Sequence, residues 1–244
     1  GFNHGTATRA PWFGCSCCPV NVARFVPSLA NYVYAQRDNE VFVNLFMGGE
    51  ATLDVDGTPV KLIQDSNYPW DGAIEIVVEP TESAEFALNV RIPGWALGQP
   101  MASDLYRYQN PQSEAFELAV NGGPQEPELV NGYAPLKRTW FKGDTVHLTL
   151  PMPIRRVLAH DDVKADRGRV AIERGPIVYC AEGIDNAGQV LNFVLPDDAE
   201  LQAEHVASLL DGVTVLKGHG LKRQRNDAGE EELNEAPITL VPYY

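Results

Sequence analysis

The chain has 244 residues, 44% hydrophobic and 21% charged, which is enough for one large or two ordinary globular domains without disulfide or metal cross-links. Its 19 lysines and arginines against 33 aspartates and glutamates give a net charge of −14. Nucleic acids and anionic membrane surfaces both attract positive charge, so this balance argues against either as a partner. No apolar run reaches the roughly 18 residues of a membrane span.

The first periodic segment, from Pro19 to about Arg37, predicts a helix. Pro19 suits the first turn, where its missing N–H is not needed, whereas Pro27 lies inside the pattern and is expected to kink the helix. A helix with a clear apolar face must pack on a partner, which is either a neighbouring sheet or a helical domain outside this chain. Apolar residues recur at spacings of three and four and share that face: Val22, Phe25, Val26, Leu29 and Val33.

After this segment the apolar period changes to two. Short runs rich in β-branched and aromatic residues follow, separated by turn sequences such as "PWDG". Regularly spaced short strands of this kind predict an antiparallel sandwich up to residue 152. The predicted strands are 40–47, 51–55, 60–64, 73–79, 85–92, 115–122, 133–140 and 144–152.

A second β unit is predicted from residue 153 onward. Two strands flank the turn-like "RGP" within 168–183, and further strands are expected at 188–195, 212–220 and 237–244. The polar, mixed stretch 196–212 suggests a short helical turn, and the charged run 223–235 an exposed loop or long hairpin tip. The predicted fold class is therefore mostly β, with one N-terminal helix followed by two antiparallel β-sandwich domains.

Three of the four cysteines crowd into the stretch "WFGCSCCPVNVARF", directly before the predicted helix. A disulfide between Cys17 and Cys18 would close a strained ring, whereas a Cys15–Cys18 disulfide has the reach and would suit an oxidising compartment. Thiolates also bind zinc well, although three packed cysteines with His4 as the nearby imidazole do not match a zinc knuckle. A fourth interpretation is a reactive thiolate at the positive end of the helix dipole. The residues alone indicate a metal or thiolate site, while the lone Cys180 is expected to be a small core residue.

The same stretch resembles the CCPxNxxR signature of glycoside hydrolase family 127, the β-L-arabinofuranosidases. Leu150–Asn186 and the terminal "ITLVPYY" are similar to this family as well. The resemblance implies an (α/α)6 barrel followed by β-sandwich domains, and a retaining exo-glycosidase whose cysteine nucleophile sits beside a zinc ion held by one glutamate and three cysteines. It implies Cys17 as the zinc-bound nucleophile and Cys18 as a further zinc ligand. Cys15 is left as a residue that packs beside the site.

The resemblance also implies roles that this chain does not fill. In the family the acid/base glutamate, the zinc-ligand glutamate and the third zinc cysteine precede the cysteine pair, yet the residues before Cys17 include no Asp or Glu. We therefore expect a fragment cut at both ends and inactive alone. Residues 1–38 would be the remnant of the barrel, 39–152 the first sandwich, and 153–244 a second sandwich truncated at its C-terminus.

The substrate implied by the resemblance is a carbohydrate with terminal β-L-arabinofuranosides of plant glycans. The competing hypothesis is a non-catalytic accessory or carbohydrate-binding module with a structural zinc or thiol cluster. For the parent protein we favour the enzyme, because a pure lectin has no need of the adjacent cysteines. We expect a cytoplasmic location, with periplasm or secretion as the alternative, since zinc can also protect thiols there. A homodimer is a further expectation with no residue pattern behind it.

Other residues that could contact ligands are expected to be structural. The expected role of the tryptophans in the β units is sandwich core rather than sugar stacking, and that of the histidines is on the surface. The acidic group near residue 162 lacks the spacing of an EF-hand. These residues are Trp70, Trp95 and Trp140, then His147, His160, His205 and His219, and finally Asp161, Asp162 and Asp166.

Overall fold

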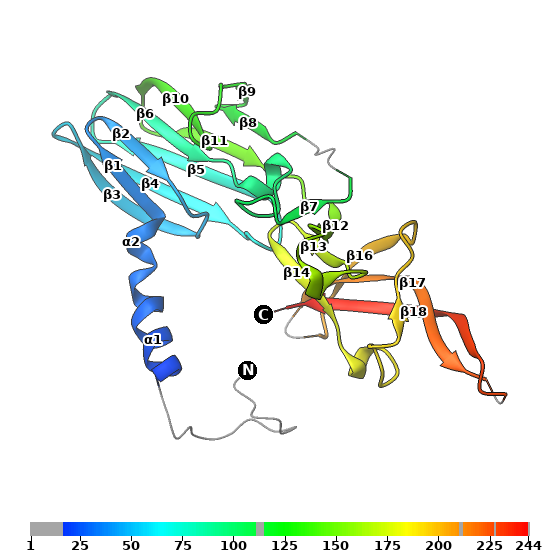
Figure 1. Cartoon of the computed structure of the whole chain (residues 1–244). Coiled ribbons are helices and arrows are strands. Elements are labelled where there is room, and N and C mark those ends of the chain that lie inside the picture. Colours follow the sequence, from blue (N-terminus) through cyan, green and yellow to red (C-terminus); the bar gives the residue numbers. More distant parts are fainter. Residues whose placement is uncertain (1–16, 111–114, 210–211, 227, 244) are drawn as a thin grey trace.

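The computed structural model describes residues 17–110, 115–209, 212–226 and 228–243. Within them a short helical segment leads into strands that form three sheets (Figure 1). The predicted fold class is confirmed, because the chain is mostly strand with a helix at its N-terminal end. None of the helices in these ranges has the length and apolar character needed to cross a bilayer.

The helical segment consists of α1 (Cys17–Phe25), the 3-10 turn η1 (Val26–Ser28) and α2 (Ala30–Val33). The interruption predicted at Pro27 is confirmed, since the α-helix ends at Phe25 and Pro27 lies within η1. The predicted extent of the helix is wrong, because residues 34–37 form a strand. Pairing with the next strand across a turn at Asp38, whose φ is 53°, outweighs the helical pattern there.

Two sheets form the first β unit and pack face to face (Figure 1). The first sheet has the order β1 (Tyr34–Arg37), β2 (Glu40–Val43), β6 (Ala84–Arg91) and β10 (Tyr133–Trp140). The second has the order β3 (Gly49–Val55), β4 (Thr58–Ser66), β5 (Ala73–Pro80), β11 (Asp144–Thr149), β8 (Glu117–Val120) and β9 (Gly123–Pro124). The pair β2 and β6 is parallel, whereas the prediction was purely antiparallel.

The core of this sandwich follows from the period-two pattern of its strands. Inward residues such as Val41 and Leu88 of one sheet and Leu62 and Ile76 of the other are fully buried in one apolar cluster. Trp140 is fully buried, and its indole N–H donates to the backbone oxygen of Phe86 at 3.2 Å. The one polar atom of this large side chain is thereby satisfied, as a buried donor requires.

The remaining strands form one eight-stranded sheet, whereas a second sandwich would have two facing sheets. Its order is β15 (Phe193–Val194), β17 (Val213–Arg225), β18 (Glu231–Pro242), β14 (Ile177–Ala181), β13 (Ala171–Arg174), β12 (Ile154–Ala159) and β7 (Tyr106–Tyr108), with β16 (Leu201–Val206) also pairing with β17. Strand β7 precedes residue 153 in the sequence, yet it belongs to this third sheet. The domain boundary expected near residue 153 stays a prediction.

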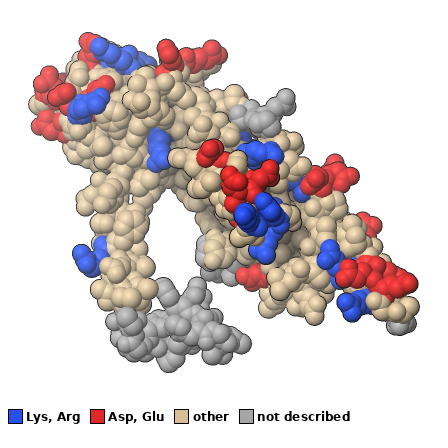
Figure 2. Space-filling view, in the orientation of Figure 1, with Lys and Arg blue, Asp and Glu red and all other residues tan. Residues whose placement is uncertain are grey.

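Two predictions for this sheet have definite outcomes. The helical turn expected within 196–212 is wrong, because residues 201–206 form β16 and pair residue by residue with β17. The charged run is confirmed as a long hairpin tip, since β17 and β18 stay paired as far as Arg225 and Glu231. Figure 2 shows acidic and basic side chains gathered at this hairpin end.

Candidate active-site cysteines and a pocket in the first sandwich

Cys17 and Cys18 are the first two residues of α1, and both side chains are exposed. Their sulfur atoms lie 3.7 Å apart. Pro19 follows in the first turn as predicted, and the side-chain amide of Asn21 donates to the backbone oxygen of Cys17 at 2.8 Å. The signature residues therefore all lie on α1, whose first turn holds the two thiols side by side.

This sulfur separation fits two ligands of one zinc ion. At the usual Zn–S length of about 2.3 Å and a tetrahedral angle, two coordinating sulfurs lie about 3.8 Å apart. A tetrahedral site needs four ligands, so the pair would supply half of one. Within the described ranges no group of three or more histidines, cysteines or carboxylates could hold a metal. Cys15 and His4 lie outside the described residues.

The helical segment stands away from the sheets (Figure 1), and Figure 2 shows it mostly uncharged on the visible face. No residue of α1 is buried, and of the predicted apolar face only Val33 is, with 8% of its surface exposed. The expectation that this face packs on a neighbouring sheet is therefore not met over its length. More than half of each of these side chains is exposed: Val20, Val22, Phe25, Val26 and Tyr32.

Cys180 and two of the three tryptophans of the β units lie in apolar surroundings, as expected, and Trp70 is only partly buried. Cys180 lies half-buried on β14 against a small apolar cluster, and burial raises the pKa of its thiol, reinforced by the charges of Glu182 and Asp185. The core role predicted for two tryptophans is confirmed, because Trp140 is fully buried and Trp95 is only 8% exposed.

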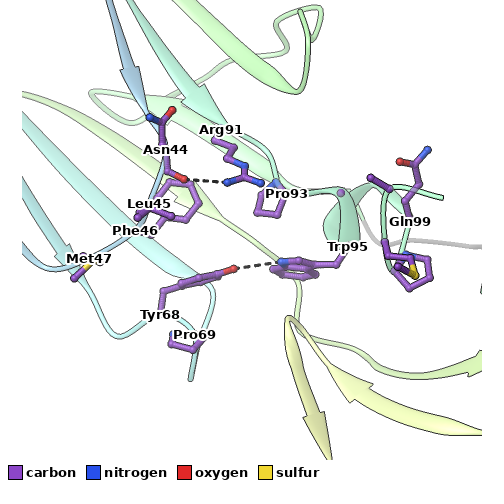
Figure 3. A pocket seen from close by; sticks show the side chains of 14 residues that line it. Asn44, Leu45, Phe46, Met47, Tyr68, Pro69, Arg91, Pro93, Trp95 and Gln99 are labelled. Atoms are coloured by element: carbon purple, nitrogen blue, oxygen red, sulfur yellow. Dashed lines mark hydrogen bonds between the residues drawn. The ribbon is translucent and has the colours of Figure 1, made fainter. Parts of the chain in front are cut away.

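A pocket that was not predicted from the sequence lies at one end of the first sandwich. Figure 3 shows its side chains, which come from the last residue of β6 and from the segments that follow β2, β4 and β6. The pocket has a volume of about 550 Å³. We call it the Arg91 pocket; it is lined by Asn44, Leu45, Phe46, Met47, Tyr68, Pro69, Arg91, Pro93, Gly94, Trp95, Gln99, Pro100, Met101 and Ala102.

Aromatic side chains form one wall of the Arg91 pocket. The indole N–H of Trp95 donates to the hydroxyl of Tyr68 at 3.3 Å (Figure 3), and Phe46 meets the Tyr68 ring edge-on with centroids 5.5 Å apart. Burial raises the pKa of Tyr68, while the Trp95 hydrogen bond and the charge of Arg91 partly offset the rise. The sequence hinted at this wall only through the aromatic and proline pairs in "NYPW" and "IPGW".

Comparisons with known proteins agree along the whole described chain. The family model for the GH127 middle domain of β-L-arabinofuranosidases matches residues 40–152, and that for the family 127 C-terminal domain matches residues 154–244. A non-reducing end β-L-arabinofuranosidase of Bifidobacterium longum subsp. longum is 34% identical over an alignment of 261 positions, which covers 99% of this chain and 36% of that protein.

Solved structures show the same relationship. A GH127 β-arabinofuranosidase superposes with a TM-score of 0.92 at 40% identity over 96% of this chain and 37% of its own. A GH127 β-L-arabinofuranosidase from Geobacillus stearothermophilus T6 gives 0.84 at 36% identity, covering 98% of this chain and 36% of its own. The chain thus spans little more than a third of these relatives. It belongs to glycoside hydrolase family 127.

Proposed function

We propose that this chain is part of a retaining exo-glycosidase that hydrolyses terminal β-L-arabinofuranosides with Cys17 as its nucleophile. The observation that carries the proposal is the pair of exposed thiols 3.7 Å apart at the start of α1, in a chain whose relatives are named β-L-arabinofuranosidases. Retaining hydrolysis needs a nucleophile on one face of the sugar and a proton donor on the other. A thiolate can replace the usual carboxylate nucleophile if it is kept deprotonated.

Cys17 and Cys18 would hold the zinc ion, which keeps coordinating thiols deprotonated when it is bound. The Cys17 sulfur attacks the anomeric carbon of the arabinofuranose, and the electron pair of the broken glycosidic bond goes to the leaving oxygen. That oxygen takes its proton from the acid/base carboxyl group. A water molecule, deprotonated by the same carboxylate, then displaces the sulfur, so that arabinose leaves with its configuration retained and the thiolate is restored.

The proton donor and the other zinc ligands are assigned to residues beyond the helical segment. No Asp or Glu occurs between Cys17 and Arg37, so α1 and α2 offer no carboxyl group for either role. The exposed apolar side chains of α1 need a partner, because contiguous exposed apolar surface marks an interaction site. In our proposal this partner is the helical barrel that the family resemblance implies, and docking brings its carboxyl groups to Cys17.

The test compares the full reading frame that contains this chain with the 244-residue chain alone. We expect the full protein to contain zinc by elemental analysis and to release arabinose from a β-L-arabinofuranoside, and the chain alone to do neither. Cys17→Ser should abolish turnover, and Cys18→Ser should lower the zinc content. Cys180→Ser is the matched control, because this thiol lies on β14 and should leave both properties unchanged.

Two outcomes would overturn the proposal. Turnover that survives Cys17→Ser would remove the nucleophile from this position. One zinc per chain in the 244-residue chain alone, lost in both substitutions, would indicate a closed structural site made of local ligands. That second result would favour the alternative function, a non-catalytic accessory or carbohydrate-binding module. For the isolated chain, the lack of Asp and Glu between Cys17 and Arg37 favours this alternative as well. The cytoplasmic location and the homodimer stay predictions.

A further inference from the structure

We propose that the Arg91 pocket binds a carboxylate-bearing sugar, a uronic acid residue of a saccharide chain. The sugar part of this inference rests on the proposed function, because a glycosidase meets glycans. The carboxylate part rests on the pocket itself. The site is separate from the cysteine pair, since α1, η1 and α2 span about 25 Å at 1.5 Å per residue between Cys17 and the sandwich.

The charge of the pocket is unusual for this protein. The chain carries a net charge of −14, yet among the described residues no Asp or Glu lines the pocket, and Arg91 is the single charged side chain there. The one hydrogen bond found for this guanidinium in the described part of the chain runs from Nη1 to the backbone oxygen of Asn44 at 3.5 Å, the outer limit for such a bond. Most of its five N–H donors therefore remain available.

A guanidinium in this state favours a carboxylate. Its planar fork can donate two parallel hydrogen bonds to one carboxylate group, and such charge-assisted bonds are about twice as strong as neutral ones. An acidic protein surface repels anions in general. A carboxylate that binds here is consequently selected by the Arg91 guanidinium and not by the electrostatic field of the whole protein.

The remaining lining suits the body of a sugar ring. Small-molecule sites combine apolar and aromatic walls with a few polar groups, in volumes of about 300–1,000 Å³, and the 550 Å³ of this pocket lies in that range. Because Tyr68 accepts from the Trp95 indole, its hydroxyl proton is left to donate to a ligand oxygen. Met47 and Met101, each 45% exposed, add apolar surface that adapts its shape.

Gln99 supplies a further polar group at the rim. Its side chain is exposed and makes no hydrogen bond to the described residues, so its amide can both donate to and accept from ring hydroxyls. The amide of Asn44 is already bonded to Tyr32 and Tyr133. A pocket with one fork, one hydroxyl, one unengaged amide and apolar walls matches a ring that carries one carboxylate and several hydroxyl groups.

The experiment titrates the 244-residue chain with trigalacturonate and, as a matched neutral ligand, galactotriose. The indole N–H signal of Trp95, assigned through Trp95→Phe, is followed by NMR. We expect trigalacturonate to shift this signal and galactotriose to bind at least about tenfold more weakly, given the strength of a hydrogen bond to a charged group. Acetate at equal carboxylate concentration should not reproduce the shift.

Variants separate the guanidinium from nonspecific attraction. Arg91→Met should weaken trigalacturonate binding about ten- to a hundredfold, and Arg91→Lys less, since it keeps the charge but loses the fork. Arg107→Met removes an exposed arginine outside the pocket and should change nothing. Unchanged thermal midpoints show that the variants fold.

Four results would overturn the inference: no binding of trigalacturonate, equal binding of galactotriose, equal binding of acetate, or full binding by Arg91→Met. None of them touches the proposed hydrolysis, which is measured through zinc content and arabinose release. If Cys17→Ser abolishes hydrolysis but still binds trigalacturonate, binding at the Arg91 pocket is independent of the proposed nucleophile.

Discussion

The hydroxyl of Tyr108 on β7 donates a hydrogen bond of 3.1 Å to Oε2 of Glu173 on β13. Arg155 stacks its guanidinium 4.7 Å from the centre of the Tyr108 ring and donates to the backbone oxygen of Trp95 at 2.5 Å. Burial, reinforced by Glu173, raises the pKa of Tyr108 to about 12. This cluster ties the segment after β6 to the third sheet.

The pH dependence of this cluster can be tested with Glu173→Gln. Burial raises the pKa of Glu173 above 4.5, although Tyr108 and Arg155 partly offset the rise. The folded state therefore holds this proton more tightly than the unfolded state, and the free energy of unfolding falls as pH rises from about 4.5 through the folded pKa. Glutamine still accepts the Tyr108 hydrogen bond without a charge, so we expect the variant to lose this fall.

The control for that prediction is Glu173→Ala, which leaves the Tyr108 hydroxyl without its acceptor. We expect it to lower the free energy of unfolding by about 1–3 kcal/mol at pH 7, while Glu173→Gln, which keeps the acceptor and removes the buried charge, is at least as stable as the parent chain at that pH. Urea unfolding at pH 4 and pH 7 measures both. Equal losses of unfolding free energy in the two variants at pH 7 would show that the charge of Glu173, and not its role as hydrogen-bond acceptor, stabilises the fold.

Asp144 gives the opposite pH dependence. Burial disfavours its charged form, but hydrogen bonds from the Phe141 N–H at 2.9 Å and the Asn121 amide at 2.8 Å, with Arg138 nearby, lower its pKa below 3.8. Its contribution to stability is thus present above pH 3.8 and is lost as pH falls through the folded pKa.

We expect Asp144→Ala to cost about 1–3 kcal/mol at pH 7, because it leaves both donors without their acceptor. The cost should shrink at pH 3, where thermal unfolding is compared. Asp161→Ala, a change at an exposed carboxylate, is the control and should stay within about 0.5 kcal/mol. A cost at Asp144 that is the same at both pH values would contradict the assigned linkage.

The apolar side chains of α1 should not contribute to the stability of the isolated chain. Val22 and Phe25 are 54% and 57% exposed, so Val22→Ser with Phe25→Ser should change the free energy of unfolding by less than about 0.5 kcal/mol. Phe86→Ala, at a fully buried residue, should cost about 3–5 kcal/mol. Sedimentation should show less self-association of the double variant. A large destabilisation there would mean that α1 packs on the sandwich in solution.

Gly72 is required by a close approach of two backbone segments. A Cβ at this residue would lie 1.8 Å from the backbone oxygen of Leu150, whose N–H donates to the oxygen of Gly72 at 2.9 Å. We expect Gly72→Ala to force these segments apart and to cost about 1–3 kcal/mol in chemical denaturation. At Gly48 the nearest atom would be 3.7 Å away, so Gly48→Ala is the control and should be tolerated.

The local order of the sequence determined most strands and the cysteine pair. Residues 133–140 were predicted as a strand and form β10 with those bounds, and 73–79 differs from β5 by one residue. Alternating apolar residues and turn sequences encode such strands within a few positions. The adjacency of Cys17 and Cys18 likewise lies in the chain itself; from it the residues alone indicated a metal or thiolate site, and the separate roles of the two thiols stay predictions.

Only the tertiary structure decided those features that depend on contacts between residues far apart in the sequence. Strands β1, β7 and β16 form because other strands pair with them. Their own residues predicted the end of a helix for β1, no regular element for β7 and a helical turn for β16. The Arg91 pocket joins segments near residues 45, 68 and 91, and no local pattern records that they meet. Sequence periodicity thus determined which residues face a core, whereas long-range pairing, whose energy appears only when the strands meet, decided which surfaces lie next to one another.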